Sequence, residues 1–508
     1  MLELLHQWAT AEPLIKGNIS WISGLDKLRI QSYQLYEEIY WNIPDSFKLL
    51  MRGAEGEPIY IPSAKTIVET LHRYMANDFS VMADPMSGTP EQQQSAMVAM
   101  TDFVRRERFY SKFSSNKRFG IIRGDWLWHI FADESRPEGS RISIFALDPG
   151  AYFPITRDEN VDEIIGAHIV EKVSDDKGKE FIHRLTYRKA TGTGGPSAID
   201  VTDDIFEVDK WGGPGQDEKA VRSVRPPFQL DAQIDSLPIY HIQNFREDGT
   251  PWGSSELRGF ERLLSAINQS ITDEDLTLVL EGLGVYATDS GHPVDEESGE
   301  PLPWTIGPGK VVETADGKTF YRVNSSATVT PYQDHLTYLH DQLDLATGTP
   351  RTAQGRVDVS VAESGIALLL EMGPILSRAS EKELIITDVM TNLLFDLRKW
   401  FGSYEPQLKI NADSPIRWLP KYGDKLPLNQ AKRFDQILQL AMSVPPVVSG
   451  QWVRSELAKL GFQMPADDSI MMKQILDEMA VIGKAQADAA GLQLDSELSQ
   501  PAGTETVA

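Results

Sequence analysis

The sequence predicts an α+β protein, and three observations support this fold class. Between residues 119 and 245, apolar and polar residues alternate, and turn signals such as Asp148-Pro149-Gly150 separate the runs. Helical patterns, with apolar residues three and four apart, lie on both sides of this stretch. Further along, a Gly- and Pro-rich segment, 284–330, separates two long helical patterns. A strand-rich module inserted among helices indicates an α+β domain.

The chain has 508 residues and no cysteine. This length allows about two to four domains with sizeable cores. The lack of cysteine excludes disulfides and thiolate metal sites and fits a reducing cytoplasm. The N-terminal residues lack the basic start and apolar run of a signal peptide, and no run of about eighteen apolar residues could span a membrane. We therefore expect a soluble intracellular protein with no membrane partner.

The chain is strongly acidic, with a formal net charge of -25 and a pI near 4.8. This charge argues against a general nucleic-acid binder, which would carry a basic footprint. The negative charge is compatible with a protein that encloses DNA without binding it tightly, because a surface of the same sign repels the phosphates. Acidity also keeps a large protein in solution, and composition alone does not separate these two interpretations.

The first helical pattern covers residues 25–41. It places Tyr33, Tyr36 and Tyr40 on one face. An aromatic stripe of this kind packs in a core more often than it forms a ligand cage, so we expect core packing.

Two more helices are expected before the β-rich stretch. After an extended piece, 57–61, Ser63 is expected to cap a helix that runs to about residue 77. Residues 89–92, Thr-Pro-Glu-Gln, form a capping-box start for a helix that runs to about Lys112.

The end of that helix carries the one clearly basic patch of the sequence. Aromatic residues are interleaved with its cations, and this combination can indicate contact with nucleic acid. Cations near a helix C-terminus also complement its dipole, and in an acidic chain they can pair with a neighbouring subunit. The sequence leaves these alternatives open. The cations are Arg105, Arg106, Arg108, Lys112, Lys117, Arg118 and Arg123.

The β-rich stretch should form a mostly antiparallel region. Its turn signals are Asp-, Gly- and Pro-containing clusters. The expected strands are 121–131, 141–147, 164–173, 181–188, 199–210 and 237–243.

Two long helices, 254–281 and 331–346, share a narrow apolar seam. Some fifty residues join them, so we expect an antiparallel pair with a small β module at its tip. An ordinary helical hairpin inside a core is the alternative. The expected seam residues are Leu257, Phe260, Leu264, Ile267, Ile271, Leu336, Leu339 and Leu343.

The tip and the segments beyond it follow from glycine and proline positions. The expected tip strands are 284–288, 310–313 and 319–323, with an acidic outer loop. Gly348 should stop the return helix, and the polar segment after it should be mobile and exposed. A third long helix should run from about residue 363 to Phe401, with a kink at Gly373-Pro374.

Short helices are then expected at about 429–442, 449–460 and 469–490, before a disordered tail.

The motifs of common catalytic sites are missing from the sequence. Gly317-Lys318-Thr319 has Val at the position of the glycine that a phosphate loop requires five residues before Gly317. Gly282-x-Gly284-x-x-Ala287 follows a helix, whereas a dinucleotide motif follows a strand. No His-Glu-x-x-His or Gly-x-Ser-x-Gly occurs. We therefore expect no enzyme activity, and no catalytic, cofactor-binding or metal-binding residues.

The order of these elements resembles the portal proteins of tailed bacteriophages, of the siphophage type. The resemblance comprises a helix, a small β tip, a return helix and a Pro-x-x-x-x-Gly loop, followed by Ser364-Gly365-Ile366-Ala367-Leu368. The tyrosine helix, the strand end at Leu147-Asp148-Pro149 and the Trp418-Leu419-Pro420 pattern also fit. Each motif is short, and their order makes the resemblance, over about residues 25–480.

The resemblance implies a portal-type fold with long stem helices, a β-rich wing, a small β clip and a helical crown. It divides the chain into a wing (1–250), a stem helix (251–283), a clip (284–330), a stem return helix (331–347), a tunnel loop (348–363), a wing helix with its extension (364–424), a crown (425–490) and a tail (491–508).

The resemblance also implies a function. The family forms a ring of about twelve subunits at one capsid vertex, a head-tail connector through which double-stranded DNA is packaged and ejected. The implied partners are further copies of the chain, the major capsid or scaffold protein, the terminase large subunit, a head-tail adaptor protein and the DNA. The protein would assemble in the host cytoplasm and end in the virion. The alternative is another virion structural or scaffolding protein without a DNA channel.

Two sets of site residues follow from the resemblance. Residues of the tunnel loop, Arg351, Gln354 and Arg356, would face the DNA. Residues of the clip would meet partner proteins, namely Asp295, Glu296, Glu297, Trp304 and Ile306.

Overall fold

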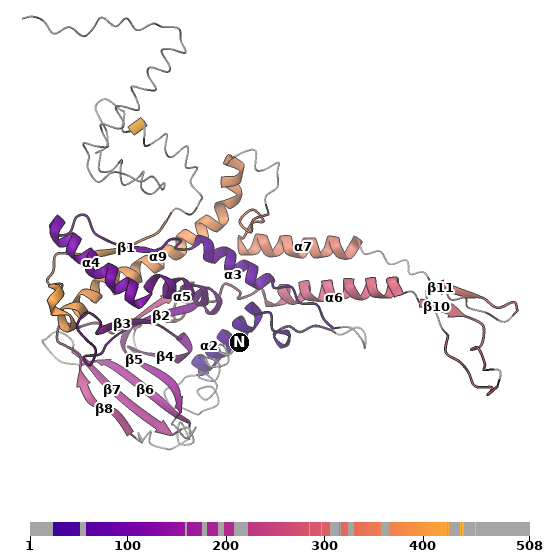
Figure 1. Ribbon diagram of the computed structural model, residues 1–508, viewed down its shortest axis with the longest axis horizontal. Coiled ribbons are helices and arrows are strands. Elements are labelled where there is room, and N and C mark those ends of the chain that lie inside the picture. The colour runs from indigo at the N-terminus through magenta and orange to yellow at the C-terminus, as the bar shows by residue number, and fades with distance from the viewer. Residues whose placement is uncertain are drawn as a thin grey trace, which may run out of the picture. The chain divides into compact units, whose positions relative to one another are not determined.

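The computed structural model divides the chain into two compact units, residues Met1–Lys425 and Leu426–Ala508. The structure describes residues 24–50, 57–157, 160–174, 180–190, 198–207, 222–283, 285–295, 297–304, 314, 316–323, 330–356, 365–423, 425, 437, 439–440 and 453. The expected crown and tail therefore lie almost wholly outside the described residues. All the helices and strands named below belong to the first unit (Figure 1).

The N-terminal part of this unit contains the helices α2 (Gly24–Tyr40), α3 (Ser63–Tyr74), α4 (Pro90–Glu107) and α5 (Phe109–Arg123). The first predicted helix is confirmed as α2. The prediction that Ser63 caps α3 was wrong, because Pro62 is the N-cap residue and Ser63 already lies in the first turn.

The capping box at Thr89 is confirmed. Its hydroxyl accepts a hydrogen bond from the Gln92 N–H, and the Gln92 side chain accepts one from the Thr89 N–H. The predicted end of this helix at Lys112 was wrong. Arg108 takes a left-handed conformation, with φ of 51°, and this break separates α4 from α5.

The three tyrosines of α2 are buried, as predicted, and they also tie α2 to its neighbours. Their hydroxyls donate to three carboxylates on different elements: Tyr33 to Asp125 (2.5 Å), Tyr36 to Glu261 (2.9 Å) and Tyr40 to Glu69 (2.6 Å).

Two antiparallel sheets form the β-rich region, in agreement with the prediction. One has the strand order β3-β2-β9 and the other β4-β5-β6-β7-β8. The strands are β2 (Asp125–Ala132), β3 (Ile142–Leu147), β4 (Tyr152–Arg157), β5 (Asn160–Ser174), β6 (Glu180–Lys189), β7 (Ile199–Glu207), β8 (Arg222–Gln229) and β9 (Ile239–Gln243).

Three features of the sheets differ from the prediction. Strand β2 begins at Asp125 instead of residue 121, because α5 continues to Arg123 and Gly124 turns the chain with φ of 105°. Strands β4 and β8 were not predicted. Strand β8 was missed because it contains Pro226 and Pro227, and proline argues against a strand. It lies at the edge of its sheet, where proline removes no ladder hydrogen bond.

Short elements complete the wing. Strand β1 (Ser80–Ala83) pairs antiparallel with β12 (Trp418–Lys421), which joins the N-terminal region to the segment after the third long helix. The 3-10 helices are η1 (Pro44–Ser46), η2 (Pro149–Ala151) and η4 (Pro406–Leu408).

An aromatic part of the core lies between α5 and β2. The ring of Phe113 stacks on Phe79, with centroids 3.9 Å apart, and meets Trp126 edge-on at 5.3 Å. Phe109 meets Trp128 edge-on at 5.0 Å. Large rings from a helix and a strand interdigitate and close this interface.

The predicted helical hairpin is present. Helices α6 (Glu261–Leu283) and α7 (Thr330–Thr347) run side by side away from the sheets, with β10 (Val285–Thr288) and β11 (Phe320–Val323) paired antiparallel at their far end (Figure 1). The predicted start of the first helix at 254 was wrong. Residues 254–260 form turns, and Gly259 has φ of 89°. The expected strand at 310–313 lies outside the described residues.

The third long helix, α9 (Gly365–Tyr404), carries Pro374 inside it and changes direction in its N-terminal part (Figure 1). The predicted kink is thus confirmed. The end differs by three residues, at Tyr404 instead of Phe401.

In the described part of the chain, no helix is both long and apolar enough to cross a membrane. No group of three or more His, Asp or Glu side chains suited to a metal ion occurs among those residues either.

Candidate functional site

The expected seam residues are deeply buried only near the base of the hairpin. Leu264 and Ile267 of α6 and Leu339 and Leu343 of α7 are all buried. Leu257 is buried too, although it lies in the turns before α6. Phe260, Ile271 and Leu336 are half-buried. The apolar contact within one chain therefore weakens towards the tip.

Other apolar side chains of the hairpin face solvent. On α6, Leu278 is 47% exposed and Val279 is 44% exposed; on α7, Tyr338 is 57% exposed and Leu345 is 77% exposed. Leu278 and Val279 lie near the tip end of α6 and Leu345 lies near the base end of α7, so these side chains are exposed at separate places along the hairpin.

Polar side chains of α6 hold a segment from the N-terminal region. Asn268 accepts from the Ile61 N–H (2.9 Å), Thr272 accepts from the Ile59 N–H (3.0 Å), and Gln269 accepts from the Leu50 N–H (2.7 Å). Sequence analysis missed this contact. The signal in the sequence was three polar residues within five positions of an apolar helix. In the structure, Asn268 is fully buried.

A buried ion cluster fixes the base of the hairpin to α9. Lys382 of α9 lies 2.9 Å from Glu256 and also donates to the Asn244 carbonyl and side-chain oxygens (3.1 and 2.8 Å). Arg378, one helical turn earlier, lies 2.5 Å from Glu256 and donates to the carbonyl of Thr347 at the end of α7.

Burial lowers the pKa of Lys382 to about 8, and Glu256 opposes that shift. The cluster joins the end of β9, the turn before α6, the end of α7 and the middle of α9. Two cations four residues apart on an apolar helix were its signal in the sequence.

The loop after α7 is folded as far as residue 356. Gly348 has φ of 63°, and the Thr349 N–H bonds to the Asp344 carbonyl (3.1 Å), which ends α7 as predicted. Ala353 is buried. Backbone hydrogen bonds fold residues 348–356 into turns, and the expected exposure is found at Arg351, Gly355 and Arg356 but not at Ala353. Residues 357–363 lie outside the described residues.

The three expected tunnel-loop residues differ from one another. Arg351 pairs with Asp341 of α7 and lies 4.0 Å from Asp344. Gln354 donates to Asp344 (2.7 Å). Burial raises the pKa of Asp344, and Gln354 opposes this shift. Arg356 is exposed, and no ion pair to another described residue holds it.

At the tip, aromatic side chains support the β10–β11 ribbon. Phe320 stacks on Tyr286 (5.4 Å between centroids), and Trp304 lies 5.6 Å from Phe320. Tyr321 and Val323 of β11 are exposed. Trp304 thus helps to hold the ribbon in shape.

The acidic loop of the tip is closed by Asp295. Its carboxylate accepts from the N–H groups of Glu297 (2.9 Å) and Ser298 (2.8 Å), and these bonds lower its pKa. Glu297 and Glu300 are exposed. Glu296 and Ile306, also expected at the partner surface, lie outside the described residues.

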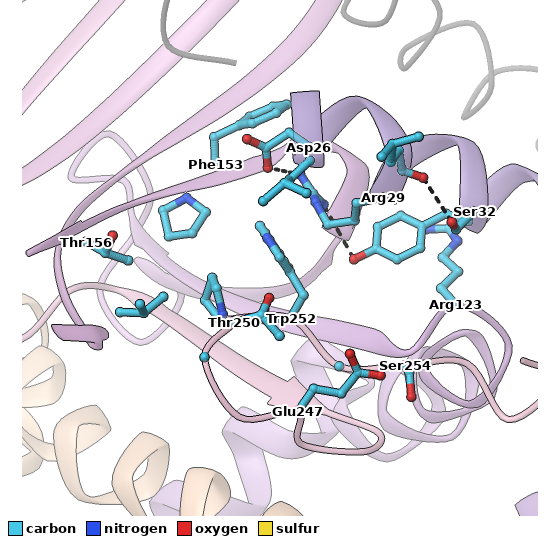
Figure 2. Close-up of a pocket in the computed structure, with 18 of the residues that line it drawn as sticks. Asp26, Arg29, Ser32, Arg123, Phe153, Thr156, Glu247, Thr250, Trp252 and Ser254 are labelled. Carbon is cyan, nitrogen blue, oxygen red and sulfur yellow. Dashed lines mark hydrogen bonds and ion pairs between the residues drawn. The ribbon is translucent and has the colours of Figure 1, made fainter. Parts of the chain in front are cut away.

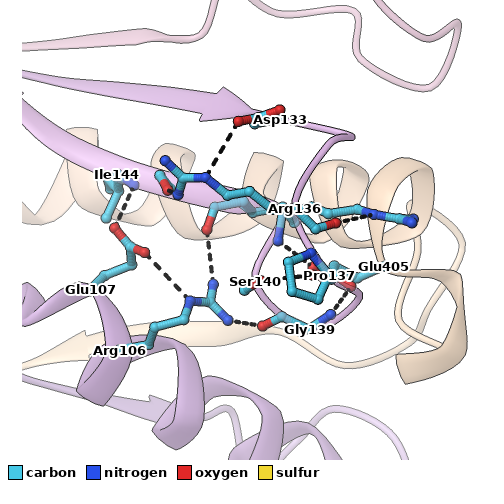
Figure 3. Close-up of polar contacts among 12 residues, drawn as sticks. Arg106, Glu107, Asp133, Arg136, Pro137, Gly139, Ser140, Ile144 and Glu405 are labelled. Atoms are coloured by element: carbon cyan, nitrogen blue, oxygen red, sulfur yellow. Dashed lines mark hydrogen bonds and ion pairs between the residues drawn. The ribbon is translucent and has the colours of Figure 1, made fainter.

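The basic patch is mostly used inside the chain. Arg106 donates to the carbonyls of Gly139 and Ile142 and lies 3.4 Å from Glu107, as Figure 3 shows. Lys117 is buried and donates to the carbonyls of His72 and Met75 (3.0 and 2.6 Å).

Other cations of the patch pair with carboxylates. Arg123 is buried against Glu37 and Asp148. Lys112 pairs with Glu107 (3.2 Å), and Arg118 pairs with Glu69 (2.8 Å). This use of the patch was not foreseen from the sequence: most of its cations pair within the chain, whereas Arg105 and Arg108 are exposed.

A cleft of about 970 Å³ opens between α2, β4 and the turn before α6 (Figure 2). The Arg29 guanidinium lies 3.6 Å over the Trp252 ring and donates to the carbonyls of Pro149 (2.6 Å) and Tyr152 (3.2 Å). Leu25 and Leu28 at its rim are largely exposed. The cleft has both apolar and cationic lining residues. Its cation Arg29 is already bound by two backbone carbonyls.

Comparisons with known proteins give limited information. No protein-family model matches the sequence, and no curated protein matches it. Among solved structures, the chain is similar to a chain of a particle described as "Neck of native GTA particle computed with C12 symmetry". The identity is 12%, the TM-score is 0.42, and the match covers 81% of this chain and 96% of that chain. At these values the likeness defines neither fold nor function.

Proposed function

We propose that the chain is the subunit of a portal-type ring at one capsid vertex, through which double-stranded DNA is packaged and ejected. The observation that supports this best is the α6–α7 hairpin. It ends in a β ribbon, its base is fixed by buried ion pairs, and it exposes apolar side chains along its length. This is the order of elements that the resemblance assigns to stem and clip.

The exposed apolar residues of the hairpin support assembly with further copies. Contact between different faces of identical chains closes into a ring when the rotation permits. In the proposed ring, neighbouring hairpins cover one another's Leu278, Tyr338 and Leu345. About twelve subunits would enclose a channel wide enough for duplex DNA, as in the family that the sequence resembles.

The proposed partners follow from the same arrangement. The clip, with its exposed carboxylates and apolar ribbon, would meet the head-tail adaptor protein and, during packaging, the terminase large subunit. The wing would meet the major capsid or scaffold protein. The finished particle would be a virion.

Electron microscopy of the purified protein tests the proposal. We expect ring-shaped particles with a central hole in views along the symmetry axis, and a solution mass that is a fixed multiple of one chain. A chain that stays monomeric or dimeric under all assembly conditions would contradict it. Particles without a hole would favour a scaffolding protein that has no DNA channel.

A further inference from the structure

A small polar pocket lies between α3 and the loop that follows α7. Its volume is about 390 Å³. Lys65 and Arg73 of α3 and Arg356 of the loop line it. These side chains come from segments far apart in the sequence, and all three residues are exposed.

The three cations are not neutralised by the chain itself. Within the described residues, no carboxylate lies at ion-pair distance from any of them, whereas Arg106, Lys112, Arg123 and Arg351 all have such partners. The pocket contains one carboxylate, Glu69, and it is engaged elsewhere, since it pairs with Arg118 (2.8 Å) and accepts from Tyr40 (2.6 Å).

The charge of Glu69 does not cancel the surplus. Burial would raise the pKa of Glu69, but the Tyr40 hydrogen bond and Arg118 outweigh this and lower it, so the carboxylate stays ionised. Three cations against one carboxylate leave the pocket positive in a chain whose net charge is -25.

We propose that Lys65, Arg73 and Arg356 bind phosphodiester groups of duplex DNA. The two guanidinium groups present paired N–H donors that match phosphate oxygens, and the lysine supplies a compact charge. A single carboxylate from a second copy would neutralise one of them. Duplex DNA carries about one charge per 1.7 Å of its axis and can neutralise all three. Such contacts do not depend on base sequence.

The role of this pocket in the particle rests on the proposed portal-type ring, which would bring the loop of each subunit beside a threaded duplex, whereas the affinity of the pocket for phosphodiester groups is a property of the single chain. It also changes the residues expected to touch DNA. Arg351 is held by Asp341 and Asp344 of its own chain. Lys65 and Arg73, in a helix some 290 residues before the loop, take its place beside Arg356.

The test compares two triple variants with the wild-type protein. The pocket variant carries Lys65→Gln, Arg73→Gln and Arg356→Gln. The control carries Arg105→Gln, Arg157→Gln and Arg246→Gln, which removes the same charge from exposed arginines that pair with single carboxylates. Ring formation is imaged for each protein. Affinity for mixed-sequence duplex DNA is then measured by fluorescence anisotropy over a series of salt concentrations.

We expect both variants to form rings. The pocket variant should bind DNA about tenfold or more weakly at low salt, and its dependence on log salt should become shallower by about 0.9 for each phosphate that it no longer neutralises. The control should bind like the wild type. Equal losses in both variants would show a bulk charge effect and overturn the proposal, as would unchanged binding in the pocket variant.

Two further outcomes would overturn it. If the pocket variant alone fails to form rings, the pocket holds a carboxylate of a neighbouring copy. If inorganic phosphate binds to the pocket but does not compete with DNA, the pocket is a small-anion site. Wild-type protein that forms no rings would instead contradict the proposed function, and the DNA affinities of the two variants would still decide on the pocket.

The absence of cysteine permits a direct check of contact. Thr66→Cys, at the pocket, and Thr101→Cys, exposed on α4, can each carry a photoactivatable crosslinker. We expect only the first to crosslink to DNA. Equal crosslinking from both positions, or none from Thr66→Cys, would contradict a phosphate site at this pocket.

Discussion

His129 of β2 lies between the two sheets, with its imidazole buried and 2.9 Å from the Tyr187 hydroxyl of β6. Burial lowers the pKa of His129 to about 4, from an ordinary value near 6.5. The unfolded chain therefore binds a proton at this position between about pH 6.5 and 4, and the folded chain does not. Stability from this group is present above pH 6.5 and is lost as the pH falls through that window.

We therefore predict that the wild type loses stability more steeply than His129→Gln between pH 6.5 and 4. The difference should reach about 3 kcal/mol across the window. Urea unfolding at a series of pH values measures it. The glutamine keeps a hydrogen-bonding group beside Tyr187, and the carboxylates titrate alike in both proteins. Parallel curves would show that His129 is not buried in its neutral form.

The buried cluster at the hairpin base gives a second prediction at this scale. Lys382→Met should cost about 1–3 kcal/mol of unfolding free energy, because it removes one of the two cations that pair with the buried Glu256 and leaves the Asn244 side-chain oxygen without this donor. Arg246→Met is the matched control, since Arg246 and Asp162 form an exposed pair that should contribute at most about 1 kcal/mol. Equal effects in chemical denaturation would contradict the burial of the cluster.

Single residues were predicted well only where their role was local. The tyrosine stripe and the capping box at Thr89 follow from spacing within one helix. The basic patch did not, because the partners of Arg123 and Lys117 come from α2 and α3 and no local pattern shows them. Arg351 was expected to face DNA, and the sequence did not show its pairing with Asp341. That contact depends on how the loop folds back on α7.

For the hairpin as an element, Leu264→Asp and Leu278→Asp should separate packing within a chain from contact between chains. Leu264 is buried between elements of one chain, so an unpaired carboxylate there should cost several kcal/mol and prevent folding of the hairpin. Leu278 is 47% exposed. Its substitution should leave the stability of a single chain unchanged and reduce ring yield.

Circular dichroism melts and sedimentation measure the two effects. Wild-type ring yield with Leu264→Asp would contradict the assignment of the seam. Wild-type ring yield with Leu278→Asp would remove the outer face of α6 from the subunit contact.

Elements with strong periodicity were predicted and irregular ones were not. Helices α2, α6, α7 and α9 carry long apolar stripes, and strands β3, β5, β6, β7 and β9 alternate. The break at Arg108 was missed because arginine is a good helix former and gives no sequence signal for the left-handed conformation that it takes here. The start of α6 was placed too early because Leu257 and Phe260 continue the apolar spacing through turns.

At the scale of the molecule, the acidic loop at the tip is expected to guide a partner protein. Glu297→Lys with Glu300→Lys should leave the proposed rings intact and slow association with the proposed head-tail adaptor, because both side chains are exposed and Asp295 still closes the turn. Glu134→Lys with Glu138→Lys, in the exposed loop between β2 and β3, makes the same charge change as a control. Association rates from surface plasmon resonance measure the effect; identical rates for both pairs would exclude this loop from the interface.

The candidate site as a whole was predictable only as an order of elements. Helix, β tip, return helix and loop were all recognised from the sequence, and their arrangement follows from chain connectivity. The pocket of Lys65, Arg73 and Arg356 was not, because α3 and the loop are far apart in the sequence and lie together only in the folded chain.

The hydrogen bonds that the backbone N–H groups of Leu50, Ile59 and Ile61 donate to Gln269, Thr272 and Asn268 of α6 also affect the order in which the chain becomes protected during synthesis. The bonded groups are 207 to 219 residues apart in the sequence. A ribosome adding about 5–20 residues per second makes the acceptors roughly 10–40 s after the donors. During translation, the N–H groups of Leu50, Ile59 and Ile61 are without these partners. The nascent chain should therefore be cut by protease near residue 60 until α6 has been synthesised, and resist cleavage there afterwards.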